Sequence, residues 1–243
     1  MISVVVRILN ERENLRKLLD ALKTQKCSIP FEIIVVDNES TDGTKELALS
    51  YGVKIVTLAR NDFSYPKAMN LGIRNCSGEY VVLTVGHALP FSNNWLETVI
   101  ENFKDKKNAG IYGGQKPRTN ADPLEFITYG YWYLRDILKG KRLVKKGPGI
   151  LGATNCAIRK SLWEKHYFNE YYECGGEDGE WAKWAIKEGY NIVFDPKFSV
   201  RHSHSMKSFA DRKKQFAYWK NLDKPTKFTK DSLVFRKDLN LQK

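Results

Sequence analysis

The 243-residue sequence has little cysteine, no long hydrophobic run and no repeated or low-complexity segment. Its four cysteines lie far apart and form no Cys-x-x-Cys pair: Cys27, Cys76, Cys156 and Cys174. We therefore expect reduced, mostly buried thiols and no zinc site. No apolar stretch approaches the length that spans a bilayer, and the first apolar run, Ile2–Leu9, contains Arg7 and lacks a signal-peptide layout. These absences predict a soluble, cytoplasmic protein.

The composition is that of a folded globular protein with an excess of basic residues. Hydrophobic residues make up 42% of the chain and aromatic residues 12%, which argues against intrinsic disorder. Lys and Arg number 40 and Asp and Glu 28, so the net charge is 40 − 28 = +12. Such an excess favours an anionic partner, either a nucleic acid, a lipid surface or a phosphorylated ligand.

Strand-like and helix-like segments alternate in the first half of the chain. The expected strands are Ile2–Leu9, Phe31–Val36, Val53–Leu58, Tyr80–Thr84 and Gly110–Gly114. The expected helices are Glu11–Lys26, Thr41–Tyr51, Ser64–Cys76 and Ser92–Lys104. Four consecutive strand–helix units predict an α/β fold whose sheet is mostly parallel, with helices on both faces.

The pattern changes after residue 115, although no linker separates two domains. We expect an aromatic helix over Pro123–Leu138, a basic loop over 139–149 and an apolar segment at Ile150–Ile158. Helices follow near Lys160–His166 and Glu177–Glu188, and then a strand pair at Asn191–Phe194 and Phe198–Val200. We divide the chain into one domain at 1–204, with halves 1–115 and 116–204, and a basic aromatic C-terminal extension at 205–243.

Asp37 is placed where a buried strand ends in a polar turn, Asp37-Asn38-Glu39-Ser40-Thr41-Asp42-Gly43. Ligands of open α/β sheets bind outside the carboxyl ends of the strands, where a carboxylate can accept hydrogen bonds from a base or a ribose. The alternative is that Asp37 and Ser40 only shape the turn or cap the next helix.

His87 has a similar position after the strand at 80–84. A histidine there can bind a metal or a phosphate, and Gly86 beside it would let the backbone approach a ligand. The alternative is a structural, hydrogen-bonded histidine. His202 and His204 are two residues apart, so on a strand they would face the same side, a spacing that suits metal binding but does not by itself establish it.

Glu177 and Asp178 follow Gly175-Gly176 at an expected helix start. Acids there can simply cap the helix and interact with its dipole. They can also provide a general base, because adjacent carboxylates point in different directions and one can face a cleft.

Taken together, these motifs resemble the GT-A fold glycosyltransferases of family 2, over roughly residues 1 to 208. The resemblance rests on the order of several short motifs: Val6–Glu11, Val36–Thr44, Phe63–Gly72, Ser77–Tyr80, Asn155–Arg159, Glu177-Asp178 and Val200–His202. The Phe63–Gly72 motif and the His-x-His tail look most like the branch that includes bacterial rhamnosyltransferases of cell-surface polysaccharide synthesis. The fold implied is a Rossmann-like, mostly parallel sheet with a C-terminal helical extension.

The resemblance also implies roles for individual residues. Asp178 matches the catalytic base, and we expect Glu177 and Glu180 to tune or orient it. The nucleotide-binding positions are Asn10, Glu11, Asp37, Lys67 and Asn70, with Asp37 matching the acid that binds a pyrimidine base. His202 matches the histidine of the metal and diphosphate site, and His204 is the less favoured equivalent.

The sequence departs from the family at the Asp-x-Asp motif, whose last acid binds a divalent cation. His87 occupies that position and Val85 replaces the first Asp. Either His87 and His202 hold Mn²⁺ or Mg²⁺, or no metal is needed and Lys67, the histidines and the basic loop neutralise the diphosphate. Because imidazole suits Mg²⁺ poorly, the sequence favours weak or absent metal dependence.

The function implied is an inverting glycosyltransferase that uses a UDP- or dTDP-type sugar. Its acceptor would be a glycan, free or lipid-linked, in bacterial capsule or O-antigen synthesis. The alternatives are a nucleic-acid-binding protein, suggested by the basic charge, and a degenerate transferase that binds a sugar nucleotide without turnover. The site motifs favour the enzyme, with no nucleic acid as partner.

The C-terminal extension interleaves aromatic and basic residues on an expected helix. Phe209, Phe216 and Trp219 would share one side, and Lys213, Lys214 and Lys220 would lie largely on others. This helix either packs on the domain or lies on the inner face of the membrane, where anionic lipids attract basic side chains.

Overall fold

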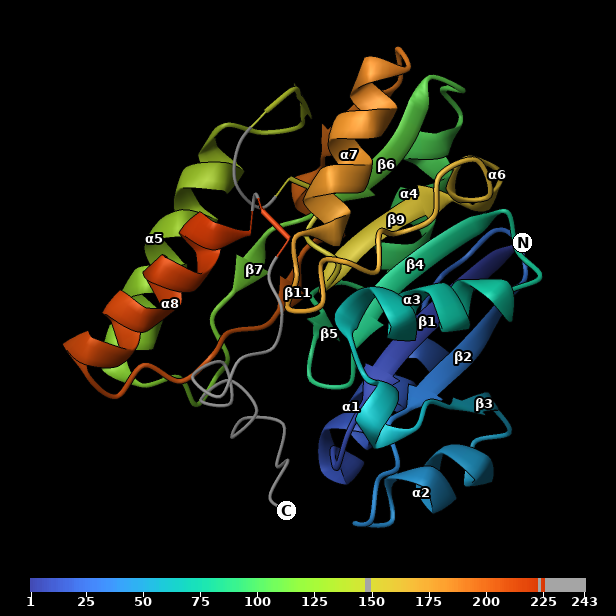
Figure 1. Ribbon diagram of the computed structural model, residues 1–243, viewed down its shortest axis with the longest axis horizontal. Helices are drawn as coiled ribbons and strands as arrows, with labels where there is room; N and C mark the ends of the chain where they lie inside the picture. The colour runs from blue at the N-terminus through green and yellow to red at the C-terminus, as the bar shows by residue number, and fades with distance from the viewer. Residues whose placement is uncertain (147–149, 223, 226–243) are drawn as a thin grey trace.

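The computed structural model describes residues 1–146, 150–222, 224 and 225 (Figure 1). The remaining parts of the basic loop and of the C-terminal extension lie outside the described residues. The strands are β1 Ile2–Ile8, β2 Phe31–Asp37, β3 Lys54–Thr57, β4 Tyr80–Val85, β5 Leu89–Pro90, β6 Asn108–Tyr112, β7 Gln115–Lys116, β8 Arg142–Val144, β9 Asn155–Arg159, β10 Asn191–Phe194 and β11 Val200–Arg201. The α-helices are α1 Arg12–Lys23, α2 Thr44–Ser50, α3 Tyr65–Arg74, α4 Trp95–Phe103, α5 Pro123–Leu138, α6 Lys160–Trp163, α7 Glu177–Lys187 and α8 Phe209–Asn221. Single 3₁₀ turns occur at Arg60–Asp62 and Pro196–Phe198.

The described residues form an eight-stranded sheet in the order β3-β2-β1-β4-β9-β6-β10-β8. The strands β1, β2, β3 and β4 pair in parallel, as the alternating sequence pattern predicts. The strand β9 runs antiparallel between β4 and β6, and β8 runs antiparallel beside β10. Most strands therefore point the same way, and the two halves of the chain share one sheet.

Helices cover both faces of this sheet, and each face has its own apolar core. On one face α1 buries Leu15, Leu18, Leu19 and Leu22, and α4 buries Trp95 and Phe103 with the same cluster. On the other face, α3 packs against β1 and β2, α6 against β9, and α7 against β10, with Met69, Trp163 and Trp181 as large buried members. The spacing of leucines in α1 predicted its buried face correctly.

A second, three-stranded sheet in the order β5-β11-β7 lies beside the large one. The expected strand pair at Asn191–Phe194 and Phe198–Val200 is wrong, because β10 joins the large sheet and β11 joins the small one. Between them Asp195 accepts a hydrogen bond from the Lys197 amide and begins the 3₁₀ turn, which redirects the chain. The small sheet brings the residues after β11 beside those before β5.

Helices α5 and α8 lie side by side at one end of the molecule (Figure 1). Trp132 of α5 contacts Phe216 and Trp219 of α8, with ring centroids 5.3 and 4.7 Å away. The Tyr218 hydroxyl donates a hydrogen bond to the Cys174 carbonyl oxygen at 2.7 Å, which ties α8 to the segment before α7. The extension is thus packed on the domain as far as residue 222. Within the described part of the chain, no helix is both long and apolar enough to cross a bilayer.

Candidate active site

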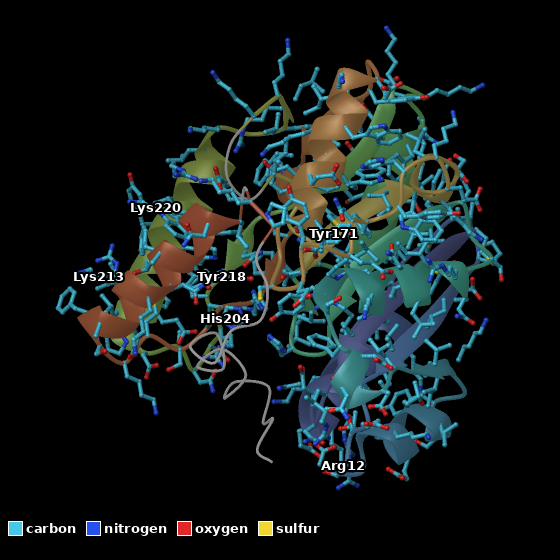
Figure 2. The ribbon with its side chains drawn as sticks, in the orientation of Figure 1. Arg12, Tyr171, His204, Lys213, Tyr218 and Lys220 are labelled. Atoms are coloured by element: carbon cyan, nitrogen blue, oxygen red, sulfur yellow. The ribbon has the colours of Figure 1, made fainter. Side chains whose placement is uncertain are left out.

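Two adjoining cavities lie where the carboxyl ends of β1, β2 and β4 face α7 and α8. The smaller, of about 270 Å³, is lined by Arg7, Glu177 and Asp178 among others. The larger, of about 600 Å³, is lined by Asn10, Lys17, Arg118 and Arg201 among others. Both share Glu11, His87, His204 and Tyr218. Figure 2 shows His204 and Tyr218 lying between α8 and the rest of the fold.

Gly175 and Gly176 place the start of α7 in this region. Both have positive φ angles, +113° and +104°, which only glycine adopts without strain. A Cβ at Gly175 would lie 2.7 Å from the Tyr218 hydroxyl, and one at Gly176 would clash with the Leu222 carbonyl. The two glycines therefore allow α8 to pack directly against the start of α7.

Asp178 is half-buried, and its carboxylate is held by two backbone amides. Ala153 N–H donates to Oδ2 at 2.6 Å and Gly179 N–H donates to Oδ1 at 2.7 Å. Burial raises the pKa of Asp178 above its ordinary value, and these hydrogen bonds and Arg7 oppose the rise. A fixed carboxylate with a raised pKa, in a cavity, is suited to take a proton from a hydroxyl.

Glu177 is more deeply buried, with 2% of its surface exposed. Its Oε2 atom has no hydrogen-bond partner among the described residues. Burial, and then the charge of Asp178, raise the pKa of Glu177 further than that of Asp178. Two amides donate to the Asp178 carboxylate, whereas Glu177 Oε2 has no donor among the described residues, so the negative charge of the pair is favoured on Asp178 and the proton on Glu177.

Glu180 does not orient Asp178, which corrects one expectation from the sequence. Its carboxylate faces His166, whose Nε2 lies 3.0 Å from Oε1. His166 stacks on Trp184, with ring centroids 4.7 Å apart. Glu180 is thus engaged with His166 and is absent from the residues that line the two cavities.

Three histidines meet at the boundary of the two cavities. Possible ligand atoms of His87, His202 and His204 all lie within 4.8 Å of one another. The small sheet causes this meeting, since β11 pairs with β5 and β7 and the His202 amide donates to the Lys116 carbonyl at 2.9 Å. The sequence predicted His202 at the diphosphate site and ranked His204 lower, and the fold places both beside His87.

Each of two imidazoles is oriented by a hydrogen bond at Nδ1. His87 Nδ1 lies 2.8 Å from Glu11 Oε2, and His202 Nδ1 lies 3.0 Å from Gln115 Oε1. Because both oxygens only accept, each Nδ1 carries the proton. The two Nε2 atoms then face each other at 3.1 Å, and each has a lone pair that can bind a cation. A Cβ at Gly86 would lie 2.7 Å from Glu11 Oε2, so Gly86 makes room for this carboxylate rather than for a ligand.

This donor set fits a divalent cation that accepts nitrogen ligands. Imidazole suits Zn²⁺, Cu²⁺, Fe²⁺ and Ni²⁺, whereas Mg²⁺ prefers oxygen ligands. Burial lowers the pKa of His202, and burial with the nearby His87 lowers that of His204 to about 4, so both present neutral rings. Histidine ligands whose second nitrogen is fixed by a carboxylate or an amide oxygen are common in metal sites.

The loops after β1 and β2 are joined by hydrogen bonds on the opposite side of the cavities. Asn10 Oδ1 accepts from the Thr41 amide at 2.8 Å, and the Asn10 amide donates to Ser40 Oγ at 2.9 Å. The Glu11 amide donates to Thr44 Oγ1 at 3.0 Å. Asp37 is 1% exposed and accepts from the Ser40 amide at 3.2 Å, so it shapes the turn as one alternative predicted. Its neighbour Asn38, not Asp37, lines the smaller cavity.

Lys67 and Asn70 do not reach the cavities. Lys67 lies in the first turn of α3, where its amide donates to Ser64 Oγ at 3.3 Å. Asn70 is 1% exposed, and its side chain bonds the Phe168 carbonyl at 2.9 Å and the Trp163 indole at 3.0 Å. Asn70 therefore joins α3 to the segment after α6 and has no position from which to contact a nucleotide.

Arg7 is a site residue that the motif analysis did not identify. It lies one position before the end of β1, half-buried in the smaller cavity, with its guanidinium carbon 4.8 Å from the centroid of the Tyr65 ring. Its Nε atom is buried and has no hydrogen-bond partner among the described residues. An arginine inside an otherwise apolar strand was the signal that could have identified it.

The family model described as "Glycosyl transferase family 2" matches residues 3–167. The chain belongs to this family. The chain is 28% identical over 181 residues to the O-antigen chain rhamnosyltransferase WbaN of Salmonella anatum, and this match covers 72% of the chain. It is 25% identical over 210 residues to RfbN of Salmonella typhimurium, another O-antigen chain rhamnosyltransferase, which covers 84% of the chain. The chain spans 58% of WbaN and 67% of RfbN. The similarity to the rhamnosyltransferase branch is confirmed.

Solved structures with the same fold include a mannosyltransferase of Pyrobaculum calidifontis in complex with GDP-Man and Mn²⁺. That structure matches with a TM-score of 0.65 and 19% identity. The match covers 99% of the present chain and 70% of the mannosyltransferase chain. TarS of S. aureus in complex with UDP has a TM-score of 0.62 and 19% identity, over 91% and 64% of the two chains. These likenesses confirm the GT-A fold.

Proposed function

We propose that the protein transfers a sugar from a UDP- or dTDP-type donor to a hydroxyl of a glycan acceptor, with inversion at the anomeric carbon. The observation that carries this proposal is that Asp178 and the three histidines line one cavity. A candidate base and a candidate diphosphate site thus border the same space, in which the reacting carbon would lie. The rhamnosyltransferases that the chain resembles support a role in bacterial surface polysaccharide synthesis.

Asp178 is the base in this proposal. One of its carboxylate oxygens takes the proton of the acceptor hydroxyl, and the hydroxyl oxygen bonds to the anomeric carbon. The bond from that carbon to the diphosphate oxygen breaks, and the diphosphate leaves with the electron pair. The amides of Ala153 and Gly179 fix the carboxylate in place, which lowers the entropic cost of reaching the reactive geometry. Glu177, which keeps its proton, is placed to donate a hydrogen bond to a sugar oxygen.

The leaving diphosphate needs positive charge, and the structure offers little of it in the smaller cavity. Arg7 is the one Lys or Arg among the described residues that line it. Lys67 lies outside both cavities, and the basic residues 139–146 follow the far end of α5. The metal-free alternative therefore loses most of the cations that it assumed. We propose instead that His87, His202 and His204 hold a divalent cation, which when bound supplies positive charge beside the diphosphate.

The nucleoside is assigned to the joined loops after β1 and β2, at Asn10, Glu11 and Asn38. Asp37 remains a proposed nucleotide-binding residue because it ends β2. Asn70 is no longer proposed to bind the nucleotide. A thermal-shift panel tests the assignment, because a ligand at about 100 times its Kd raises the free energy of unfolding by about 2.7 kcal/mol. UDP or dTDP should stabilise the protein more than GDP does, and the reverse order would contradict the pyrimidine assignment.

The central experiment replaces Asp178 with Asn and compares it with Glu180→Gln. Both changes remove one carboxylate near the start of α7, but Glu180 faces His166 instead of the cavity. Loss of a general base typically costs about 10²–10⁴ in rate. We expect kcat for nucleoside diphosphate release in the presence of acceptor to fall by that factor in Asp178→Asn, with UDP or dTDP binding by calorimetry retained. Glu180→Gln should keep most of the rate, and near wild-type turnover by Asp178→Asn would refute the assignment.

A further inference from the structure

Helix α5 presents an apolar stripe to solvent. Ile127, Tyr131, Leu134 and Leu138 are 64, 65, 58 and 78% exposed. Their spacing places all four on one side of the helix. The buried residues Glu125, Thr128 and Tyr129 occupy the opposite side. The stripe thus faces away from the fold, and no described residue covers it.

Helix α8, which lies against α5, has its own outward-facing side. Phe216 and Trp219 are turned toward Trp132 of α5, so the aromatic residues that the sequence offered to a membrane are used in packing. Phe209 is 77% exposed, and Lys213 and Lys220 are exposed four and eleven positions later. These three therefore share one exposed flank of α8, the flank that adjoins Phe216 and hence α5. Figure 2 shows Lys213 and Lys220 at the outer edge of α8 and Tyr218 on its inner side.

The charge around these two stripes is mostly positive. The segment after α5 adds four exposed lysines, namely Lys139, Lys141, Lys145 and Lys146. The nearby acids are already engaged: Asp136 pairs with Arg135 and Arg142, and Asp211 accepts from the Ser208 hydroxyl in the cap of α8. Lys141 pairs with Asp195 at 3.6 Å, and the other exposed lysines on the neighbouring helix and on the following segment border the apolar stripe.

We propose that this surface docks on an anionic phospholipid bilayer. We call it the α5–α8 face, made up of Ile127, Tyr131, Leu134, Leu138, Phe209, Lys213 and Lys220. Exposed apolar patches of this kind mark interaction sites. An anionic bilayer matches this one, because it offers an apolar interior to the apolar side chains and negative phosphates to the lysines. The aliphatic and aromatic side chains enter the interface, while the lysines extend to the lipid phosphates. The cavities and the α5–α8 face use different residues, so this inference stands independently of the proposed reaction.

Sedimentation with vesicles at low salt tests the proposal with two matched pairs of variants. Leu134→Gln is compared with Leu49→Gln, because Leu49 on α2 is equally exposed at 59% and lies far from the face (Figure 1). The double variant Lys213→Gln/Lys220→Gln is compared with Lys45→Gln/Lys106→Gln, which removes two exposed lysines from α2 and from the turn before β6. All four replace exposed side chains, and unchanged melting temperatures verify that each variant is folded.

We expect the wild-type protein to bind vesicles of phosphatidylglycerol with phosphatidylcholine and to bind phosphatidylcholine alone much more weakly. Leu134→Gln should weaken binding by about tenfold, from the lost apolar burial. The lysine pair should weaken it by about 25-fold, since each lysine near an anionic surface contributes about a factor of five. The two control variants should bind within about twofold of wild type by the same reasoning.

Three outcomes would overturn the proposal. Equal binding by the face variants and their controls would mean that net charge alone attracts the protein. A dimer in light scattering that Leu134→Gln dissociates would make a second copy the occupant of the stripe. Vesicle binding that begins only after residues 226–243 are removed would make that segment the occupant.

Discussion

On one side of the cavities, the loops after β1 and β2 hydrogen-bond to each other; on the other, at the start of α7, buried polar atoms lack such partners. Asn10 and Ser40 exchange contacts across the first pair of loops, and Glu11 adds another through Thr44. Near α7, Glu177 Oε2, Trp181 Nε1 and Arg7 Nε are buried without hydrogen-bond partners within the described ranges. Asn38 Oδ1 in the joined loops is also buried without a partner among the described residues, so the two sides differ in the hydrogen bonds between their segments and not in whether unpaired polar atoms occur.

The joined loops are thus a preformed support, while the unpaired Glu177 and Arg7 lie with Asp178 in the smaller cavity, where a ligand can reach them. Buried polar groups in native proteins are nearly always paired, so unpaired ones point to a ligand, a water or a functional role. In the proposed reaction the joined loops hold the donor. A sugar or an acceptor then supplies the missing hydrogen bonds of Glu177 and Arg7, whereas Trp181 lies outside both cavities. Changes at α7 should thus alter turnover, and changes to the hydrogen bonds that join the loops should mainly alter stability.

The largest expected effect is loss of the cation at the boundary between the two sides. Treatment with EDTA should lower turnover by about 100-fold or more, because a bound cation contributes several kcal/mol of charge stabilisation. Zn²⁺ or Mn²⁺ should restore turnover better than Mg²⁺, as imidazole ligands suit Mg²⁺ poorly. Full activity in EDTA would restore the metal-free alternative that the missing Asp-x-Asp suggested.

A direct titration distinguishes the cation site from a general effect on the enzyme. His87→Ala should weaken binding of the metal alone, measured by calorimetry. His166→Ala is the matched control, because His166 contacts Glu180 and Trp184 and lies outside the cluster. Equal loss of metal affinity in both variants would place the cation elsewhere.

An intermediate effect is expected for Arg7, on the α7 side. Asp178 must be ionised to act as a base, so kcat/KM falls about tenfold per pH unit below its pKa. Burial raises that pKa and Arg7 lowers it, so Arg7→Met should raise it further and move the acid limb of kcat/KM to higher pH. At pH 6 the variant should be several-fold slower, and near pH 9 the difference should shrink.

The conservative change Arg7→Lys keeps the charge and should keep the acid limb near its wild-type position. A limb that moves equally in both variants would show that Arg7 acts through packing on Tyr65 instead of through its charge. An unchanged limb in Arg7→Met would remove Arg7 from the environment of Asp178.

The smallest effect is expected on the joined loops, at Ser40. Ser40→Ala removes the acceptor of the Asn10 amide, and one such bond contributes about 1 kcal/mol to the free energy of unfolding. Denaturant unfolding should show this loss, while kcat should change by less than about twofold. Ser50→Ala is a control, because the Ser50 hydroxyl donates to Leu47 within a single helix. A large fall in kcat for Ser40→Ala would erase the distinction between the two sides.

The first half of the fold could be predicted because local patterns determine it. The apolar runs of β1 and β2 and the leucine stripe of α1 each give a local signal. In the second half of the chain, helix α5 also begins and ends at the predicted residues. The position of β9 could not be predicted, since an apolar segment gives no sign that it will pair between β4 and β6. For the same reason the sequence could not show that β10 and β11 belong to different sheets.

Several residues chosen from motifs line the cavities, while their roles stay predictions. Asp178, Glu11 and His87 were identified and do line the cavities. Asn70 carries the same kind of motif signal, but tertiary packing turns its side chain toward Trp163. Glu180 was expected beside Asp178, yet the helix turns it toward His166. The buried aromatic side of α8 depends on Trp132, a contact between residues far apart in the sequence that periodicity cannot reveal.

The small sheet also has a consequence for the order in which the molecule is made. Its two-residue strands bring together His87 and His202, which are 115 positions apart in the chain. A ribosome releases the N-terminal segments first, so β1 to β4 can pair while β11 is still unmade. An unfinished chain then has the loops assigned to the donor but neither the histidine cluster nor Asp178. Because β11 is needed to complete the cluster, a nascent chain lacks the proposed cation site until the rest of the molecule has emerged.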